Sequence, residues 1–307
     1  MSLLWDSQVM PHTEIGGHRL ALSNLDKVLY PATGFTKGEA IRYYAAVADV
    51  LLPHLDGRPL SFLRFPDGVE GEKFFTKHVP PGTPDWVTTR KITVVSRTPL
   101  NQVLIQDEAT LVWAANLAAL ELHTPQWQSD HQAEADRLVF DLDPGEGADI
   151  LDCRRLADWL RERVADDGIA LLPKTSGSKG LHLIAAIERT PSDRVSAYAK
   201  RLAQQAEAEL PDHAVSKMAK DLRPGKVFVD WSQNNQAKTT AAPYTLRAKQ
   251  RPTASTPLTW AELAAADRPE DLVFLGTELP QRIEEYGDLL APLLESAAGS
   301  GRGRIPA

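Results

Sequence analysis

The sequence has one cysteine, Cys153, and no apolar run close to the roughly 18 residues that a membrane-spanning helix needs. A single cysteine excludes an internal disulfide and a cysteine-based metal site. The N-terminal segment MSLLWDSQVMPH lacks the basic stretch followed by an apolar stretch that marks a secretory signal. Internal repeats are also absent, and no low-complexity tract precedes the tail. Together these absences predict a soluble, cytoplasmic protein.

What the sequence does contain is an ordinary globular composition with unevenly distributed charge. Apolar residues make up 43% of the 307 residues and charged residues 24%, which excludes a largely disordered or collagen-like chain. The net charge of −7 argues against a global positive field for nucleic acid. Residues 216–251, however, carry eight Lys or Arg and two Asp, a net charge of +6. This basic segment surrounds Asp230, so a local anion-binding surface is still expected.

Hydrophobic periodicity predicts helices and strands in mixed order, without the strict β-α-β alternation of a parallel sheet. Thr36 and Glu39 stand in capping-box spacing at the start of the first helix. We expect an α+β fold, one two-lobed domain with mixed sheets flanked by helices over residues 1–296, and a flexible tail or linker at 297–307. The expected helices are 37–52, 108–122, 153–164, 192–210, 259–265 and 281–296, and the expected strands are 60–65, 92–96, 102–105, 137–144, 169–173, 181–187 and 227–231.

Two acidic residues, Asp141 and Asp143, lie two positions apart in the apolar segment 137–144. In a strand, the period of two places both carboxylates on the same face. Adjacent carboxylates are costly unless they are neutralised, and oxygen ligands suit Mg²⁺ or Mn²⁺. The pattern favours a divalent-metal site, and the alternative is an acidic turn before Pro144 that caps a following helix.

Asp230 ends a second short apolar strand, 226–231. On a strand next to the first pair, a third carboxylate would complete a two-metal site for in-line displacement at phosphorus. As a lone motif, an aspartate that caps a strand end is the plainer interpretation. The basic residues on both sides favour a functional role.

A Gly/Ser loop with one lysine, Lys179, occupies residues 175–182 between two expected strands. Backbone N–H groups and small hydroxyls in such a loop can hold a triphosphate, and the lysine adds positive charge. The loop is not a Walker A motif, because its spacing differs and a strand follows it instead of a helix. A plain hairpin turn is the alternative, and His182 fits a satisfied buried histidine equally well.

Phe74 and Phe75 lie between two Pro/Gly turns, in an expected loop, beside Lys73, Lys77 and His78. Paired aromatic residues next to basic residues are typical of base stacking beside phosphate contacts. The alternative is a loop anchored by phenylalanines that are buried in the core.

Five segments of the sequence, in this order, resemble the primase–polymerase domain of bacterial DNA ligase D, a branch of the archaeo-eukaryotic primase superfamily. The resemblance covers about residues 22–288, and several ordered matches are more specific than any single motif. It implies an archaeo-eukaryotic primase-like fold and a catalytic domain over 1–296. The matching segments are NLDKVLYP at 24–31, VFDLDPG at 139–145, TSGSKGLH at 175–182, VFVDWSQN at 227–234 and APYTLR at 242–247.

The resemblance also implies roles for individual residues, several of which no local pattern distinguishes from ordinary surface positions. The carboxylates that are catalytic and bind metal are expected to be Asp141, Asp143 and Asp230. The residues expected to hold the incoming nucleotide are His123, Ser176, Lys179, Gly180, Arg223, Gln233 and Arg247. A 5′-phosphate on the downstream side of a DNA gap is expected at Asn24, Lys27 and Lys37, and template bases are expected to stack on Phe74 and Phe75.

From the resemblance we expect template-directed nucleotide addition that fills short gaps and processes ends in non-homologous end joining or in gap or excision repair. The mechanism would use two divalent ions, Mn²⁺ or Mg²⁺, and the substrates would be NTPs or dNTPs, with ribonucleotides preferred. The implied partners are gapped or broken double-stranded DNA with a 5′-phosphate, a Ku-like end binder and a ligase domain. The implied location is the bacterial cytoplasm, at the nucleoid. The sequence contains no ligase or nuclease motif, so a stand-alone enzyme and a module of a longer ligase stay open.

Two other functions also stay open. The first is a DNA-end binding and synapsis module whose catalysis is secondary, and the intact carboxylate set argues against lost catalysis. The second is a nucleotidyltransferase or phosphohydrolase that acts on small nucleotides without a template. The paired phenylalanines and the basic segment favour a polymeric substrate over this second possibility.

Overall fold

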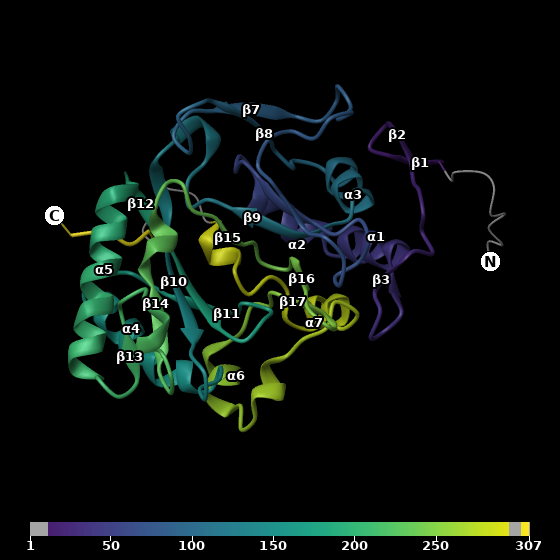
Figure 1. Ribbon diagram of the computed structural model, residues 1–307. Coiled ribbons are helices and arrows are strands. Elements are labelled where there is room, and N and C mark those ends of the chain that lie inside the picture. The colour runs from purple at the N-terminus through teal and green to yellow at the C-terminus, as the bar shows by residue number, and fades with distance from the viewer. Residues whose placement is uncertain (1–11, 295–301, 307) are drawn as a thin grey trace.

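The computed structural model describes residues 12–294 and 302–306, and a five-stranded mixed sheet forms the centre of its C-terminal half (Figure 1). All neighbouring strands are antiparallel except β13 and β14, which are parallel. Helices α4 (Asp152–Ala165) and α5 (Ser192–Glu209) pack on one face of this sheet. The strand order is β11 (Leu172–Thr175), β12 (Leu181–Pro191), β10 (Glu134–Pro144), β14 (Val227–Asp230) and β13 (Ala214–Val215).

A four-stranded antiparallel sheet forms the other half, together with helices α1 (Lys37–Ala46), α2 (Ala48–Leu55) and α3 (Glu108–Asn116). Its order is β15 (Thr240–Ala241), β9 (Ala119–Thr124), β5 (Ser61–Arg64) and β6 (Phe74–Thr76). The remaining strands form two-stranded pairs, β1 (His12–Ile15) with β2 (His18–Ala21), β3 (Val28–Tyr30) with β4 (Phe35–Thr36), β7 (Thr89–Ile92) with β8 (Leu100–Val103), and β16 (Leu246–Ala248) with β17 (Pro252–Ala254).

Two large apolar clusters correspond to these two halves. The first is built mainly from residues 20–122 and takes in 242–279 as well, and the second lies between residues 135 and 272 and includes Ile305. Each sheet buries one face against its own helices, as an amphipathic sheet must. The expected α+β fold with two lobes and mixed sheets is therefore confirmed.

The expected first helix is two helices. Thr36 caps α1 through a capping box, in which its hydroxyl accepts a bond from the Glu39 N–H at 3.2 Å and the Glu39 carboxylate accepts one from the Thr36 N–H at 2.7 Å. The helix ends at Val47, whose φ of −102° and ψ of 5° depart from helical values, and α2 follows from Ala48 to Leu55. The predicted start is confirmed, and the predicted continuous helix is not.

Two further expectations about helices are wrong in part. Residues 108–122 were expected to be one helix, but α3 ends at Asn116 and β9 begins at Ala119, after Ala118 adopts a positive φ of 55°. Pairing of β9 with β5 in the core outweighs the helix propensity of this Ala/Leu-rich segment. Similarly, α7 (Leu279–Tyr286) ends at Gly287, whose φ of 67° stops a helix that we expected to reach residue 296.

The smaller elements also depart from expectation. The strands expected at 92–96 and 102–105 are the hairpin β7–β8, whose strands lie two to three residues earlier. The short helices α6 (Trp260–Ala265), η1 (Ser129–His131), η2 (Lys220–Leu222), η3 (Trp231–Asn234), η4 (Pro269–Leu272) and η5 (Ala291–Leu293) complete the fold. No helix in the described ranges is both long and apolar enough to cross a membrane.

Part of the expected linker is packed against the domain. Gly303 bridges Ile187 of β12, in the stretch of that strand beyond its pairing with β11, and Ile305 is buried in the second core. A tail at 302–306 is therefore not a free linker. The rest of the predicted tail, 297–301 and 307, lies outside the described residues.

Candidate active site

Four polar residues form a row across one face of the five-stranded sheet. Asp141 on β10 lies directly opposite Asp230 on β14 and opposite His182 on β12, and His182 in turn lies opposite Lys174 on β11. Asp143, two residues further along β10, shares this face because strand side chains alternate with a period of two. The intervening residues of β10 point into the second core, on the other face. The predicted shared face of the two aspartates is confirmed, and the third carboxylate lies on the adjacent strand.

The side chains of this row are held by neutral donors. Gln233 donates from Nε2 to Asp230 Oδ2 at 2.9 Å and to Asp141 Oδ2 at 3.4 Å. His182 Nε2 lies 3.3 Å from Asp141 Oδ1, and the Ser232 hydroxyl donates to Asp230 Oδ1. In the described part of the chain, His182 Nδ1 and Gln233 Oε1 are buried without a hydrogen-bond partner. The site therefore carries unsatisfied polar atoms directly beside its carboxylates.

Burial and mutual repulsion disfavour the ionised form of the two β10 aspartates. Burial, and then the charge of Asp230, raises the pKa of Asp141 to about 7. Burial, and then the charge of Asp141, raises the pKa of Asp143 to about 6. Lys174 is completely buried, and burial followed by the charge of Arg247 lowers its pKa well below the usual range. Protein groups alone thus leave the negative charge of this face incompletely compensated near neutral pH.

The donor chemistry at this face fits a divalent cation. Carboxylate oxygens are the ligands that Mg²⁺ and Mn²⁺ prefer, and a cation would relieve the repulsion that raises both pKa values. Within residues 12–294 and 302–306, no three His, Cys, Asp or Glu side chains converge closely enough to ligate one metal ion. The backbone register brings Asp141, Asp143 and Asp230 to one patch, and a complete ligand set is not formed there.

The Gly/Ser loop lies between two strands, as predicted, and it is the turn of the β11–β12 hairpin, which the sequence left as the alternative interpretation. It lies against the end of β10. Ser176 organises the loop, because its hydroxyl oxygen accepts bonds from the Ser178 N–H at 3.2 Å and the Gly180 N–H at 3.1 Å. Lys179 reaches the carbonyl of Pro144. A Cβ on Gly180 would lie 2.3 Å from the carbonyl oxygen of Leu142, so only glycine permits this close approach. The loop is thereby fixed beside the carboxylates.

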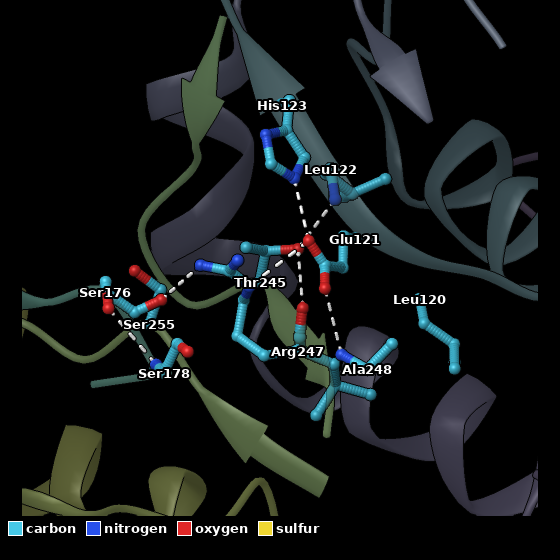
Figure 2. Close-up of polar contacts among 12 residues, drawn as sticks. Leu120, Glu121, Leu122, His123, Ser176, Ser178, Thr245, Arg247, Ala248 and Ser255 are labelled. Carbon is cyan, nitrogen blue, oxygen red and sulfur yellow. Dashed lines mark hydrogen bonds and ion pairs between the residues drawn. The ribbon is translucent and has the colours of Figure 1, made fainter. Parts of the chain in front are cut away.

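A buried carboxylate that the sequence interpretation missed, Glu121, lies at the centre of the contacts in Figure 2. Glu121 Oε2 is 2.9 Å from His123 Nε2 and 3.2 Å from Arg247 Nε, and its Oε1 accepts a bond from the Ala248 N–H at 3.0 Å. Arg247 also donates to the carbonyl of Ser176. The four-stranded sheet is in this way linked to the loop of the five-stranded sheet.

The charges in this cluster stabilise one another. Burial alone would raise the pKa of Glu121, but the hydrogen bond from His123 and the charge of Arg247 lower it to about 2. Burial lowers the pKa of His123 despite its bond to Glu121. Glu121 is therefore ionised at any physiological pH, and its negative charge is shared by several donors.

Arg223 and Gln233 approach the carboxylates from the other side. Arg223 donates to the Met218 carbonyl at 2.6 Å, and its guanidinium lies 3.8 Å from the ring centroid of Phe228. The segment that carries Arg223 is joined to the end of β10 by a bond from the Gly145 N–H to the Lys226 carbonyl at 2.8 Å. The residues expected to contact the nucleotide thus come from five segments, namely β9, the β11–β12 turn, the stretch after η2, η3 and β16.

Asn24, Lys27 and Lys37 form a separate group in the first half of the molecule. Asn24 adopts a positive φ of 51° and begins a turn in which its carbonyl accepts the Lys27 N–H at 3.1 Å. The Lys27 carbonyl in turn accepts the N–H of Lys37, the first residue of α1, at 2.8 Å. Burial, and then the charge of Lys27, lowers the pKa of Lys37 to about 8. Lys27 Nζ forms an ion pair with Asp67 Oδ1 at 2.7 Å, and Lys37 Nζ donates to the Ser23 carbonyl at 2.6 Å. An anion at this helix N-terminus would therefore compete with Asp67 for Lys27.

Phe74 and Phe75 lie on β6, the edge strand of the four-stranded sheet, and not in the expected loop. Their exposed fractions are 42% and 56%, so the alternative of core anchors is wrong. Lys77 Nζ is 5.6 Å from the ring centroid of Phe75. Because successive strand side chains alternate, the two exposed rings point to opposite faces of β6, and each offers a separate stacking platform.

A family model described as LigD, primase-polymerase domain, matches residues 36–290. The chain is 46% identical over 278 residues to the multifunctional non-homologous end joining protein LigD of Mycolicibacterium smegmatis, which covers 90% of this chain and 36% of that protein. It is 29% identical over 283 residues to the bifunctional non-homologous end joining protein LigD of Bacillus subtilis, covering 92% of this chain and 45% of that protein. The chain therefore spans less than half the length of these curated relatives.

A solved structure, described as the polymerase domain from Mycobacterium tuberculosis ligase D in complex with DNA, has a similar fold. The two chains superpose with a TM-score of 0.85 and share 43% sequence identity. The match covers 90% of this chain and 98% of that one. The similarity thus covers nearly the whole of that solved chain.

Proposed function

The chain belongs to the family of LigD primase-polymerase domains, which are nucleotidyltransferases, and we propose that it fills short gaps and processes ends in DNA break repair. The repair would be non-homologous end joining or gap or excision repair. The observation that carries the proposal is the carboxylate face of β10 and β14, flanked by a Gly/Ser loop and by Arg247. Acidic ligands next to phosphate-binding groups are what a nucleotidyl transfer site needs.

The three carboxylates Asp141, Asp143 and Asp230 are proposed to hold the metal ions. When bound there, two divalent ions, Mn²⁺ or Mg²⁺, would supply activation of the primer 3′-hydroxyl and stabilisation of the leaving pyrophosphate. Gln233 holds two of the carboxylates in place through its amide. The pairing of Asp141 with Asp230 in register keeps both within reach of one substrate phosphate.

The nucleotide, an NTP or dNTP with ribonucleotides preferred, is proposed to lie between the carboxylates and the loop. Its phosphates would meet backbone N–H groups and positive side chains, which offset the charge of the reacting phosphate. Arg247, from the β16–β17 hairpin, and Lys179, from the loop, supply charge from two directions. The residues proposed to contact the nucleotide are His123, Ser176, Lys179, Gly180, Arg223, Gln233 and Arg247.

DNA is proposed to bind through two surfaces. Asn24, Lys27 and Lys37 would bind the 5′-phosphate on the far side of the gap, which the paired ammonium groups favour. Phe74 and Phe75 would stack on template bases, because both rings are exposed on an edge strand. A Ku-like end binder and a ligase domain are proposed as protein partners, and the bacterial nucleoid as the site of action.

One observation favours a second function, DNA-end binding and synapsis with catalysis secondary. The Asn24–Lys37 group belongs to the first core and has its own hydrogen bonds, so it would bind a DNA end without any chemistry at β10. Catalysis by Asp141 and DNA binding by Lys37 are therefore separable, and a gapped DNA substrate tests both.

The test is extension of a primer across a one-nucleotide gap, with and without a downstream 5′-phosphate. We expect addition that follows the template base and is stimulated by the 5′-phosphate. The assay compares NTPs with dNTPs, each in Mn²⁺ and in Mg²⁺. Asp141→Ala abolishes addition and leaves gap binding intact, whereas Asp158→Ala, on the exposed face of α4, has no effect. Lys27→Ala and Lys37→Ala remove the stimulation. Tight gap binding with no addition under any condition would establish the end-binding function instead.

A further inference from the structure

Glu121 lies beside the proposed triphosphate site, which is an unfavourable position for a carboxylate. A carboxylate there repels phosphate, and this cost has to be offset by some other gain. The side chain of Glu121 is only 6% exposed and both of its oxygens already accept from protein donors. Its charge is therefore directed at the protein and not at a ligand.

The donors that Glu121 holds are themselves proposed nucleotide ligands. Strand β9 places Glu121 and His123 on the same face, because they are two residues apart, while the leucines between and before them pack in the first core. Arg247 comes from β16, a different element, and reaches the same carboxylate oxygen as His123 (Figure 2). One buried oxygen thus fixes two side chains that the chain places far apart in sequence.

Each of the two side chains also has polar atoms that point away from Glu121. With Nε2 of His123 bound to the carboxylate, the Nδ1 edge of the ring faces the other way. With Nε of Arg247 beside the carboxylate, the terminal nitrogens extend toward the Ser176 loop. Ordering these long or rotatable side chains before substrate arrives removes an entropic cost from nucleotide binding.

We infer that Glu121 is a positioning residue of the nucleotide site, which orients His123 and Arg247 toward the incoming nucleotide. This inference rests on the proposed function, since it concerns the same site. Its role is distinct from the contact between Glu121 Oε1 and the Ala248 N–H, which ties β16 to β9 and supports the fold. A purely structural role would change stability and leave nucleotide affinity unchanged.

The test measures kcat and KM for the nucleotide in gap extension, and the melting temperature, for Glu121→Gln. We expect KM to rise at least ten-fold, with kcat changed less than KM. Glu121→Asp keeps the charge but shortens the side chain by one methylene, so it should keep the melting temperature close to wild type and still raise KM several-fold. Glu262→Gln is the matched control, because Glu262 also holds an arginine, Arg282, outside this site, and glutamine preserves its helix cap.

A double variant separates positioning from an independent effect. If Glu121 acts through Arg247, then Glu121→Gln combined with Arg247→Ala should raise KM no more than about two-fold beyond Arg247→Ala alone. Multiplied effects of the two substitutions, or an unchanged KM in both Glu121 variants, would overturn the inference and leave the proposed function standing. An unchanged KM in Arg247→Ala would instead show that the nucleotide site is misassigned, and both proposals would fail at that point.

Discussion

Asp141 and Asp143 lie in a setting that opposes their ionisation. The folded chain raises their pKa values from 3.8 to about 7 and about 6, respectively, so between these values and pH 4 it binds more protons than the unfolded chain. By linkage, the contribution of these two carboxyls to the stability of the metal-free protein falls as pH rises through this window, by at most roughly 1.4 kcal/mol for each unit of pKa shift. The buried histidines His54, His123 and His182 act in the opposite direction, because burial lowers their pKa values. Ionised carboxylates are also the form that ligates a cation. We expect Mn²⁺ to raise the melting temperature at pH 8 and to have little effect at pH 5.

Thermal melts between pH 5 and pH 8, with and without Mn²⁺, check this dependence. Asp141→Asn removes the larger of the two shifted groups, so from pH 5 to pH 8 its metal-free melting temperature should fall less, or rise more, than that of wild type. Asp158→Asn, a surface substitution on α4, should follow wild type at every pH. Equal changes with pH in wild type and in Asp141→Asn would contradict the assignment of these charges.

The positions of functional side chains could be predicted where a short sequence pattern indicated them. The period of two in a strand was enough to place Asp141 and Asp143 on one face, and it holds in the structure. Glu121 was not predicted to be a site residue because residues 108–122 were predicted to form a helix. In a helical conformation, residues 121 and 123 would point in directions about 200° apart. As a strand, the same residues share one face and share a hydrogen bond. Lys174 was missed because nothing local to it shows that β11 lies two strands from the carboxylates.

At the scale of elements, contacts between distant segments decided what local propensity left open. The Ala/Leu-rich stretch after Asp107 is helical only as far as Asn116, and β9 then pairs with β5. The Phe74–Phe75 segment has Pro and Gly on both sides, which indicates a loop, yet it adds a short strand to the edge of the same sheet. Strands on both sides of the Gly/Ser loop, by contrast, were expected from its two apolar flanks, and both formed, although β11 covers 172–175 instead of the expected 169–173.

The approach of the β11–β12 turn to the end of β10 makes a testable demand on Gly180. Alanine there would place a Cβ 2.3 Å from the Leu142 carbonyl oxygen, so the turn must shift by most of an ångström. We expect Gly180→Ala to raise the nucleotide KM at least ten-fold, because Ser176 and Lys179 move with the turn, and to lower the unfolding free energy by about 1–3 kcal/mol. Gap-extension kinetics and urea denaturation measure the two effects.

Ser178→Ala is the control within the same turn. The Ser178 side chain is exposed, and the bond that Ser178 makes to Ser176 comes from its backbone N–H, which alanine keeps. This variant should match wild type in both measurements. Kinetics of Gly180→Ala that equal those of Ser178→Ala would show that the close approach to β10 is not needed for nucleotide binding.

On the scale of the whole molecule, the two cores are joined by buried polar contacts as well as by apolar packing. Arg58, just before β5, donates from Nη2 to Asp136 Oδ2 on β10 at 2.8 Å, and both side chains are buried. His54 of α2 contacts Asp288 at 2.8 Å, and Arg137 of β10 reaches the His54 carbonyl. The active site lies where Arg247 makes a further link of this kind. Its geometry therefore depends on contacts made on both sides of the boundary between cores, which no single stretch of sequence reveals.

Asp136 tests how strongly these links hold the two halves together. Burial would raise its pKa, but the charges of Arg58 and Arg137 hold that pKa below the usual range, so the carboxylate is ionised in the folded chain. Asp136→Asn leaves two buried arginines facing a neutral amide, and we expect a loss of about 3–5 kcal/mol in unfolding free energy, measured by urea denaturation. Asp158→Asn, which breaks an exposed pair with Arg161, should cost less than about 1 kcal/mol.

Because the nucleotide ligands lie elsewhere, the nucleotide KM of Asp136→Asn should stay within about two-fold of wild type at temperatures where the variant is folded. An equal loss of stability in the two variants would mean that the buried pair between the cores contributes no more than a surface pair.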